Sequence, residues 1–155
     1  MLQIGDSVPD FELLTDAGEP LMLSELRGRR VVLFFFPKAD TPGCTKQACG
    51  FRDRFPRIET ANATVLGLSP DQPKALAKWK EKESLPYILL SDPDHEVAEA
   101  FGAWGEKSMY GKSYMGILRG HAIIGPDGTI EDLRVKISPE ESVEEAVKFI
   151  DAQAA

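Results

Sequence analysis

The sequence predicts an α/β protein, a three-layer α/β/α sandwich around a mixed central sheet. Residues 30–36 and 64–68 are apolar at nearly every position, as expected of central strands that are covered on both faces. Helical segments separate such runs, which gives the β-α-β order of a parallel core. Later, the turn signal GPDG at residues 125–128 lies between two further apolar runs and predicts an antiparallel hairpin. The length of 155 residues suits one domain, residues 1–155.

The helix after the first long strand is predicted from the residues at its two ends. Thr41 has the character of an N-cap, and Pro42 suits the first helical position. We expect this helix to run to about residue 55, because Pro56 lacks an amide hydrogen and would end or kink it.

Shorter signals predict the remaining elements. In chain order they are an extended segment at residues 11–14, a helical turn at 24–26, a helix capped by Asp71 through 74–82, a strand at 87–90, a short helix at 96–101, strands at 121–124 and 129–135, and an amphipathic helix at 139–152. The last helix has apolar residues on one face: Val143, Ala146, Val147 and Ile150. Residues 102–118 contain four glycines and little periodicity, so we expect a functional or mobile loop there.

Composition and charge argue against several classes of function. The chain has 18 Lys and Arg residues against 25 Asp and Glu, a formal charge of −7, whereas nucleic-acid and anionic-membrane surfaces need basic patches. The opening MLQIGDSVPDFELL lacks the basic start and apolar stretch of a signal peptide. The longest apolar run, residues 31–36, is too short to span a bilayer. We therefore expect a cytoplasmic protein with no nucleic-acid and no membrane partner.

Both cysteines of the chain, Cys44 and Cys49, lie near the start of the helix predicted after Thr41. Cys44 falls in the first turn, where free backbone N–H groups and the helix dipole favour the nucleophilic thiolate form. In an ideal helix, residues five apart have Cα atoms separated by roughly 8–9 Å, whereas a disulfide does not close beyond about 7 Å. A bond between these cysteines therefore requires the first turns to unwind, and a reducing cytoplasm also disfavours a permanent disulfide.

Other interpretations of the two cysteines are possible. Structural zinc needs four ligands, and the only histidines, His95 and His121, are far apart and form no second pair, so a metal site is weakly supported. A thioredoxin-like dithiol uses C-x-x-C, whereas the spacing here is C-x-x-x-x-C. Two unrelated cysteines are the simplest alternative. Cys49, which is close to Phe51, suits that alternative better than Cys44 does, because Cys44 follows Thr-Pro-Gly at a helix start.

The residues around Cys44 carry a resemblance to a known family. Pro37, Thr41 and Cys44 form the pattern P-x-x-x-T-x-x-C, which resembles the active-site signature of the peroxiredoxins. The string FFPKADTPGCTKQACGFRD is similar to the bacterioferritin-comigratory-protein or PrxQ-type subfamily, which often has a second cysteine five positions after the first. The resemblance extends through GDSVPDFELL, VVLFFFPK, LSDPDHEVAEAFGAWGEKSMYGK and Arg119. It implies a thioredoxin-like fold of the peroxiredoxin type and a thiol-dependent peroxidase that reduces hydrogen peroxide and organic hydroperoxides.

The resemblance implies a role for five residues. Cys44 would be the peroxidatic cysteine, which attacks the O–O bond and becomes a sulfenic acid. Cys49 would be the resolving cysteine, which forms an intramolecular disulfide with it. Thr41 would orient the thiolate and the peroxide, and Pro37 would shield the sulfur from water. Arg119 would stabilise the thiolate and hydrogen-bond the peroxide, as a nucleophilic cleavage with growing charge on oxygen requires.

The resemblance also implies partners. Thioredoxin or a similar dithiol would reduce the disulfide. No cofactor or metal is implied, because the cysteine carries the chemistry, and an intramolecular resolving cysteine favours a monomer. An alternative from another class is a redox sensor or chaperone-like protein, in which the same oxidation exposes apolar surface near Phe51 and Phe55 without sustained turnover.

The sequence departs from the subfamily at a few positions. The family usually has Thr or Ser and then Phe shortly after the arginine, and often Asp at the end of that strand, whereas RGHAIIG places His121, Ala122 and Gly125 there. Many members have Glu where Gln47 stands. We expect packing variations at these positions, with the histidine close enough to alter the polarity of the active site.

Overall fold

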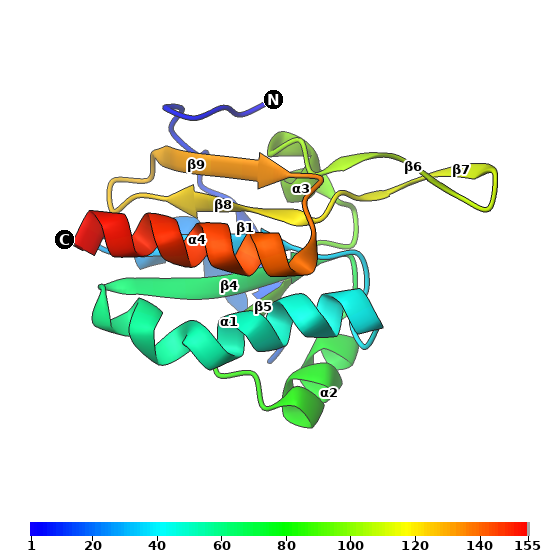
Figure 1. Ribbon diagram of the computed structural model, residues 1–155, viewed down its shortest axis with the longest axis horizontal. Helices are drawn as coiled ribbons and strands as arrows, with labels where there is room; N and C mark the ends of the chain where they lie inside the picture. Colours follow the sequence, from blue (N-terminus) through cyan, green and yellow to red (C-terminus); the bar gives the residue numbers. More distant parts are fainter. Residues whose placement is uncertain (155) are drawn as a thin grey trace.

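The fold is built on a seven-stranded mixed sheet with helices on both of its faces (Figure 1). The computed structural model describes residues 1–154. The strands of the sheet are β1 (Glu12–Thr15), β2 (Pro20–Met22), β3 (Arg30–Phe35), β4 (Ala63–Ser69), β5 (Ile88–Ser91), β8 (Gly120–Ile124) and β9 (Ile130–Val135). The helices are α1 (Pro42–Thr60), α2 (Pro73–Glu83), α3 (Glu96–Ala100) and α4 (Pro139–Ala154), with a 3-10 turn η1 (Leu23–Leu26). None of the helices within residues 1–154 combines the length and apolarity needed to cross a membrane.

The order of strands across the sheet is β2-β1-β5-β4-β3-β8-β9. The three central strands β3, β4 and β5 are parallel. On one side β8 pairs antiparallel with β3, and β9 pairs antiparallel with β8, so the predicted parallel core with a late hairpin at its edge is confirmed. On the other side β1 and β2 add a second antiparallel edge. The extended segment expected at residues 11–14 corresponds to β1, whereas β2, with only three residues, was not predicted.

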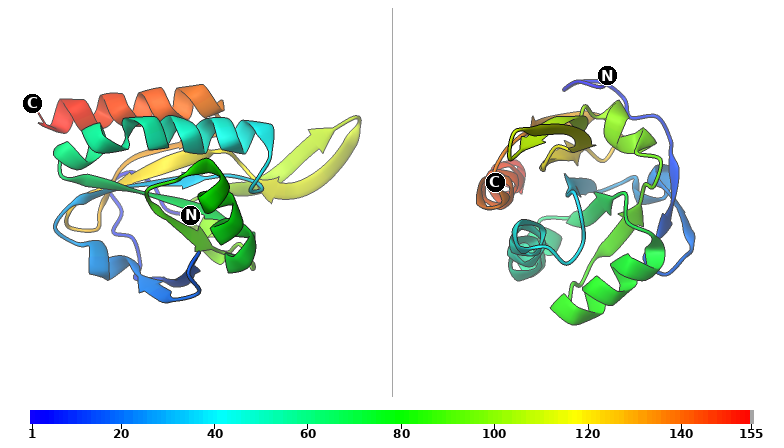
Figure 2. Two further views of the ribbon diagram at one scale, coloured as in Figure 1. Left: turned by 90° about the horizontal axis from the view of Figure 1, so that it is seen from below. Right: turned by 90° about the vertical axis from the view of Figure 1, so that its right-hand side faces the viewer.

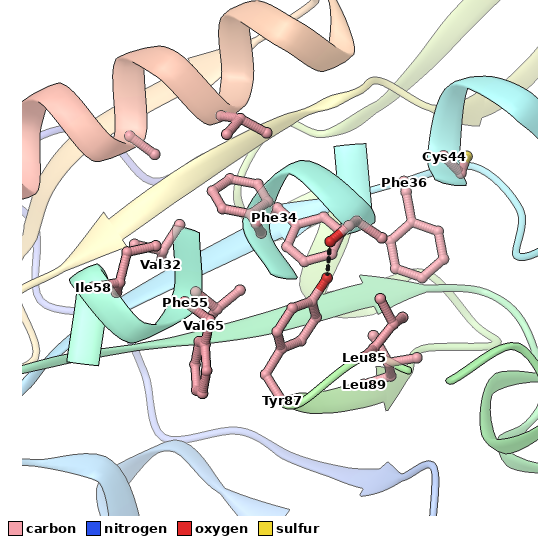
Figure 3. Close-up of a cluster of buried hydrophobic side chains, with 14 of the residues drawn as sticks. Val32, Phe34, Phe36, Cys44, Phe55, Ile58, Val65, Leu85, Tyr87 and Leu89 are labelled. Atoms are coloured by element: carbon pink, nitrogen blue, oxygen red, sulfur yellow. Dashed lines mark hydrogen bonds between the residues drawn. The ribbon is translucent and has the colours of Figure 1, made fainter. Parts of the chain in front are cut away.

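Strand β3 shows why its run is apolar at every position. Phe34, and Phe36 just after the strand, belong to the hydrophobic cluster beneath α1, α2 and α4. This cluster includes Tyr87 and is drawn in Figure 3. Leu33 and Phe35 point to the opposite face, which is covered by α3, η1 and the N-terminal segment. Figure 2 shows α1 and α4 side by side on one face of the sheet. Both faces of β3 are therefore buried, as the sequence predicts.

Helix α1 continues through Pro56 to Thr60, so its predicted end near residue 55 is wrong. A proline inside a helix removes one backbone hydrogen bond. Two buried side chains on either side of it, Phe55 and Ile58, pack into the core beneath the helix. Tertiary packing of this face holds the helix together across the proline, since packing supplies most helical stability in proteins.

Asp71, which was predicted to cap the second helix, does not occupy the cap position. Helix α2 begins with Gln72 as N-cap. The Asp71 carboxylate instead accepts hydrogen bonds from the Ala39 backbone N–H at 2.7 Å and from the Ser69 hydroxyl at 2.8 Å. It thereby ties the connection between β3 and α1 to the end of β4.

The expected loop at residues 102–118 is in large part a two-stranded hairpin, formed by β6 (Trp104–Met109) and β7 (Lys112–Ile117). It projects from the body of the molecule (Figures 1 and 2). Tyr110 and Gly111 both have positive φ angles, 53° and 78°, as a tight two-residue hairpin turn requires. The strands carry few buried residues, so no alternating pattern marks them in the sequence.

His121 lies within the sheet, on β8, and is fully buried. Its Nδ1 atom is 2.8 Å from the Ser142 hydroxyl of α4, and its Nε2 atom has no partner among the described residues. Burial lowers the pKa of His121 to about 4, with Asp132 opposing the shift and Arg134 adding to it.

We expect acidification to destabilise the fold through His121. The unfolded chain protonates this imidazole near the ordinary pKa of 6.5, whereas the folded protein does so only at about 4. The unfolded state therefore binds the extra proton between these values, and the free energy of unfolding falls as the pH drops through this window, by on the order of 3 kcal/mol. Urea unfolding at several pH values between 7 and 4.5 measures the slope. In His121→Asn the slope should flatten, and an unchanged slope would contradict the assignment.

Candidate active site

Cys44 lies where the chain passes from the sheet to the first helix. It is the third residue of α1, just beyond the end of β3. Its side chain is 1% exposed, and its thiol is free. The first backbone N–H groups of a helix have no carbonyl partner within the helix, so this position favours a negatively charged sulfur.

Arg119 supplies a positive charge to Cys44. It precedes β8, and its Nη1 atom donates to Cys44 Sγ at 3.4 Å and to the Gln47 side-chain oxygen at 3.1 Å. A Cβ atom on Gly43 would lie 3.0 Å from Arg119 Nη2, so the absence of a side chain at Gly43 leaves room for the guanidinium. The structure thus brings together Cys44 and Arg119, two of the predicted site residues that are 75 positions apart.

Thr41 and Pro37 lie in the connection between β3 and α1. Thr41 occupies the N-cap position with an extended backbone, as predicted, and its carbonyl accepts the N–H of Thr45 at 2.8 Å. Its side chain does not cap the helix. The hydroxyl donates to the Lys38 carbonyl at 2.7 Å, which braces the connection from within. Pro37 directly follows the buried Phe36 and is half-buried.

Cys49 lies five residues after Cys44 in the same unbroken helix, and its thiol is also free. It is partly exposed, and its Sγ donates to a Glu83 carboxylate oxygen of α2 at 3.6 Å. Burial raises the pKa of the Cys49 thiol, Glu83 raises it further, and Arg52 opposes the shift. Cys49 is therefore held as a neutral thiol while α1 is folded.

Two buried aromatic side chains hold the cysteine-bearing part of α1 in place. The Tyr87 hydroxyl donates to the Ala48 carbonyl at 2.6 Å, the contact drawn as a dashed line in Figure 3. The Trp79 indole N–H donates to the Thr45 hydroxyl at 3.3 Å. Burial raises the pKa of Tyr87 well above its ordinary value, so the phenol remains a donor at neutral pH. The helix between Cys44 and Cys49 is thus bonded to the core as well as to itself.

A second set of polar residues lies behind Arg119 and was not predicted from the sequence. Gln47, which in the sequence is only a departure from the family pattern, is fully buried, as is Ser142 of α4. The Gln47 side-chain N–H donates to Ser142 Oγ at 3.1 Å and to the Gly120 carbonyl at 3.3 Å. The one available signal was a polar residue on the apolar face of a helix, at Gln47 and again at Ser142.

Lys107 brings a further positive charge toward the site from β6. Its ammonium donates to the Ile117 carbonyl at 2.9 Å. Burial lowers its pKa, and the nearby charge of Arg119 lowers it further. The position of Lys107 could not be predicted from the sequence, because the hairpin of β6 and β7 was not predicted.

A groove of about 350 Å³ lies beside Cys49 between α1 and α4. Its lining residues are Lys46, Cys49, Gly50, Asp53, Arg54, Glu140, Val143 and Glu144. Within residues 1–154, no three His, Cys, Asp or Glu side chains gather into a group that could hold a metal ion.

Comparison with known sequences identifies the family. Residues 4–133 match the AhpC/TSA family. The chain is 50% identical to "Peroxiredoxin Bcp" of Escherichia coli K12 over 130 residues, which cover 84% of this chain and 83% of that protein. It is 50% identical over 129 residues to a putative Bcp peroxiredoxin of Haemophilus influenzae, with 83% of each chain covered.

Comparison with solved structures gives the same answer. A cysteine-to-serine mutant of Xylella fastidiosa PrxQ superposes with a TM-score of 0.94 at 30% identity, covering 100% of this chain and 99% of that one. Peroxidoxin BcpB of Mycobacterium tuberculosis has a TM-score of 0.86 at 36% identity, with 98% of each chain covered. These structures confirm the thioredoxin-like fold of the peroxiredoxin type. The chain therefore belongs to the AhpC/TSA family, among its Bcp-type peroxiredoxins, which are thiol-dependent peroxidases.

Proposed function

We propose that this chain reduces hydroperoxides with Cys44 as peroxidatic cysteine and Cys49 as resolving cysteine, and that a thioredoxin-type dithiol recycles it. The observation that carries the proposal is the Arg119 guanidinium, 3.4 Å from a buried cysteine sulfur in the first turn of a helix. Support for the substrate comes from a relative: the structures of Xanthomonas campestris bacterioferritin comigratory protein, 28% identical with a TM-score of 0.88, are described as giving insight into its alkyl peroxide reduction activity.

In the first step the Cys44 thiolate attacks the terminal oxygen of the hydroperoxide ROOH. An S–O bond forms, the O–O bond breaks, and RO⁻ leaves and takes a proton to give the alcohol. The sulfur is oxidised to a sulfenic acid while the peroxide is reduced. Arg119 and the first backbone N–H groups of α1 stabilise the negative charge that grows on oxygen. Thr41 orients the peroxide through its hydroxyl, which first leaves the Lys38 carbonyl, and Pro37 limits the access of water.

In the second step the Cys49 thiol attacks the sulfenic sulfur, a disulfide forms, and water leaves with the thiol proton. The two Cα atoms of an intact helix at this spacing lie roughly 8–9 Å apart, which is too far for a disulfide. The first turns of α1 must therefore unwind. Unwinding breaks the bonds that Trp79 makes to Thr45 and that Tyr87 makes to Ala48.

In the third step a dithiol reductant restores both thiols by thiol–disulfide exchange and is itself oxidised. The groove between α1 and α4 beside Cys49 gives it a place of attack. Because the resolving thiol belongs to the same chain, the cycle needs no second subunit, and we propose a cytoplasmic monomer that forms one domain.

The proposal is tested by the oxidation of NADPH, coupled through thioredoxin reductase and thioredoxin, with hydrogen peroxide as substrate. Wild type should turn over many times and lose two thiols to one equivalent of peroxide. Cys44→Ser should not turn over, and Cys49→Ser should react once and stop as a sulfenic acid. A wild-type protein that keeps both thiols would refute the proposal. One oxidation without turnover, whichever dithiol is supplied, would point to a redox sensor.

We expect Tyr87→Phe to speed disulfide formation. The substitution removes only the hydroxyl that holds the Ala48 carbonyl, while that carbonyl remains within α1. A neutral hydrogen bond contributes about 1 kcal/mol, so the step from sulfenic acid to disulfide should become about fivefold faster, and the fraction of sulfinic acid formed at high peroxide should fall. Rapid-quench mass spectrometry measures both quantities.

The control for this variant is Tyr110→Phe, in the hairpin turn, where the side chain is 96% exposed. It should leave both quantities at their wild-type values. If Tyr87→Phe lowers the free energy of unfolding without changing the rate of disulfide formation, the Tyr87 hydroxyl does not restrain the unwinding of α1.

A further inference from the structure

A chain of polar groups runs from Cys44 through the half-buried Arg119 to His121 on β8. Arg119 donates to the Gln47 side-chain oxygen at 3.1 Å, and the Gln47 amide nitrogen lies 3.1 Å from Ser142 Oγ. Ser142 Oγ is 2.8 Å from His121 Nδ1. Gln47, Ser142 and His121 are each 0% exposed, so no bulk solvent competes for these bonds. The proposed reaction uses Arg119 but does not by itself explain the three residues behind it.

The direction of each bond follows from the groups at the start of the chain. An arginine only donates and a backbone carbonyl only accepts. The Gln47 amide therefore turns its oxygen to Arg119 and its nitrogen to the Gly120 carbonyl, at 3.3 Å. The same nitrogen donates to Ser142, which leaves the Ser142 hydroxyl proton free to be donated onward.

The onward acceptor is His121. If Ser142 donates to Nδ1, the imidazole is neutral with its proton on Nε2, and only that N–H lacks a partner among the described residues. The opposite tautomer would leave Nε2 without a donor and the Ser142 hydroxyl without an acceptor as well. Because unpaired buried polar groups are costly, the first arrangement is favoured.

We propose that Gln47, Ser142 and His121 are positioning residues, a neutral hydrogen-bonded chain that holds the Arg119 guanidinium against Cys44. The inference rests on the proposed role of Cys44. The chain places an amide rather than a carboxylate against Arg119. None of these three residues has a carboxylate, so they fix Arg119 in place without neutralising its charge. That positive charge remains available to the sulfur and to the peroxide oxygens.

The test compares two Ser→Ala variants, one within α4 and one just before it. Ser142→Ala breaks the chain, whereas Ser138→Ala removes a hydroxyl that precedes α4 and accepts the Glu141 N–H at 3.1 Å. We expect Ser142→Ala to lower the second-order rate constant with hydrogen peroxide by about tenfold, because the loss of one buried hydrogen bond has an effect of this order. Alkylation of Cys44 by iodoacetamide, which needs no donor to peroxide oxygen, should fall less. Ser138→Ala should leave both rates unchanged.

Two variants at His121 separate positioning from packing. His121→Asn keeps an acceptor close to the place of Nδ1, whereas His121→Leu fills similar volume and accepts no hydrogen bond. The chain predicts that the asparagine variant retains the peroxide rate and that the leucine variant loses about as much as Ser142→Ala. If leucine is the better tolerated of the two, His121 serves packing alone and the inference is overturned.

A last experiment tests whether the loss of rate in Ser142→Ala depends on Arg119. In an Arg119→Ala background, Ser142→Ala should cause no further loss of rate, because the chain then has nothing to hold. An additive loss would overturn the inference. Failure of the proposed function looks different, since wild type itself would then not react with peroxide.

Discussion

The contact between Arg119 and Cys44 is the interaction on which the site depends, and the register of the sheet sets it. Strands β3 and β8 are antiparallel, and Phe35 at the end of β3 faces Gly120 at the start of β8. Arg119 therefore lies just beyond the edge at which the chain leaves β3 for α1 and Cys44. A slip of one residue would turn every side chain of β8 to the other face and remove this meeting.

The sequence predicts the central elements well, because burial on both faces leaves a clear apolar run in β3 and β4. It also identifies Cys44 and its helix start, since the cap and the proline are local signals. Arg119 could be identified only through the resemblance to a family, because no local sequence pattern indicates its contact with Cys44, 75 positions earlier. The hairpin of β6 and β7 escaped prediction since neither face of it is well buried.

The polar residues behind Arg119 were beyond sequence reasoning for a related reason. Gln47, His121 and Ser142 come from α1, β8 and α4, and each stands among apolar neighbours that pack the core. In the sequence, each of the three is a single polar residue that interrupts the apolar pattern of its helix or strand. The predicted role of Asp71 was wrong because a carboxylate just before a helix usually caps it. Here the carboxylate instead accepts a hydrogen bond from the Ala39 N–H, 32 positions away. Long-range hydrogen bonds override local preference at these positions.

Pro56 has a consequence for how α1 responds to oxidation. A proline donates no hydrogen bond, so the backbone ladder of α1 has a gap between Pro56 and the carbonyl of Arg52. Both cysteines lie on one side of that gap, together with the buried Phe51 and Phe55, and Ile58 is anchored in the core on the other side. The two halves of the helix are thus less tightly coupled through the backbone than an uninterrupted ladder would make them. The unwinding proposed for the first turns is thereby less readily transmitted past Pro56, where Ile58 stays packed in the core.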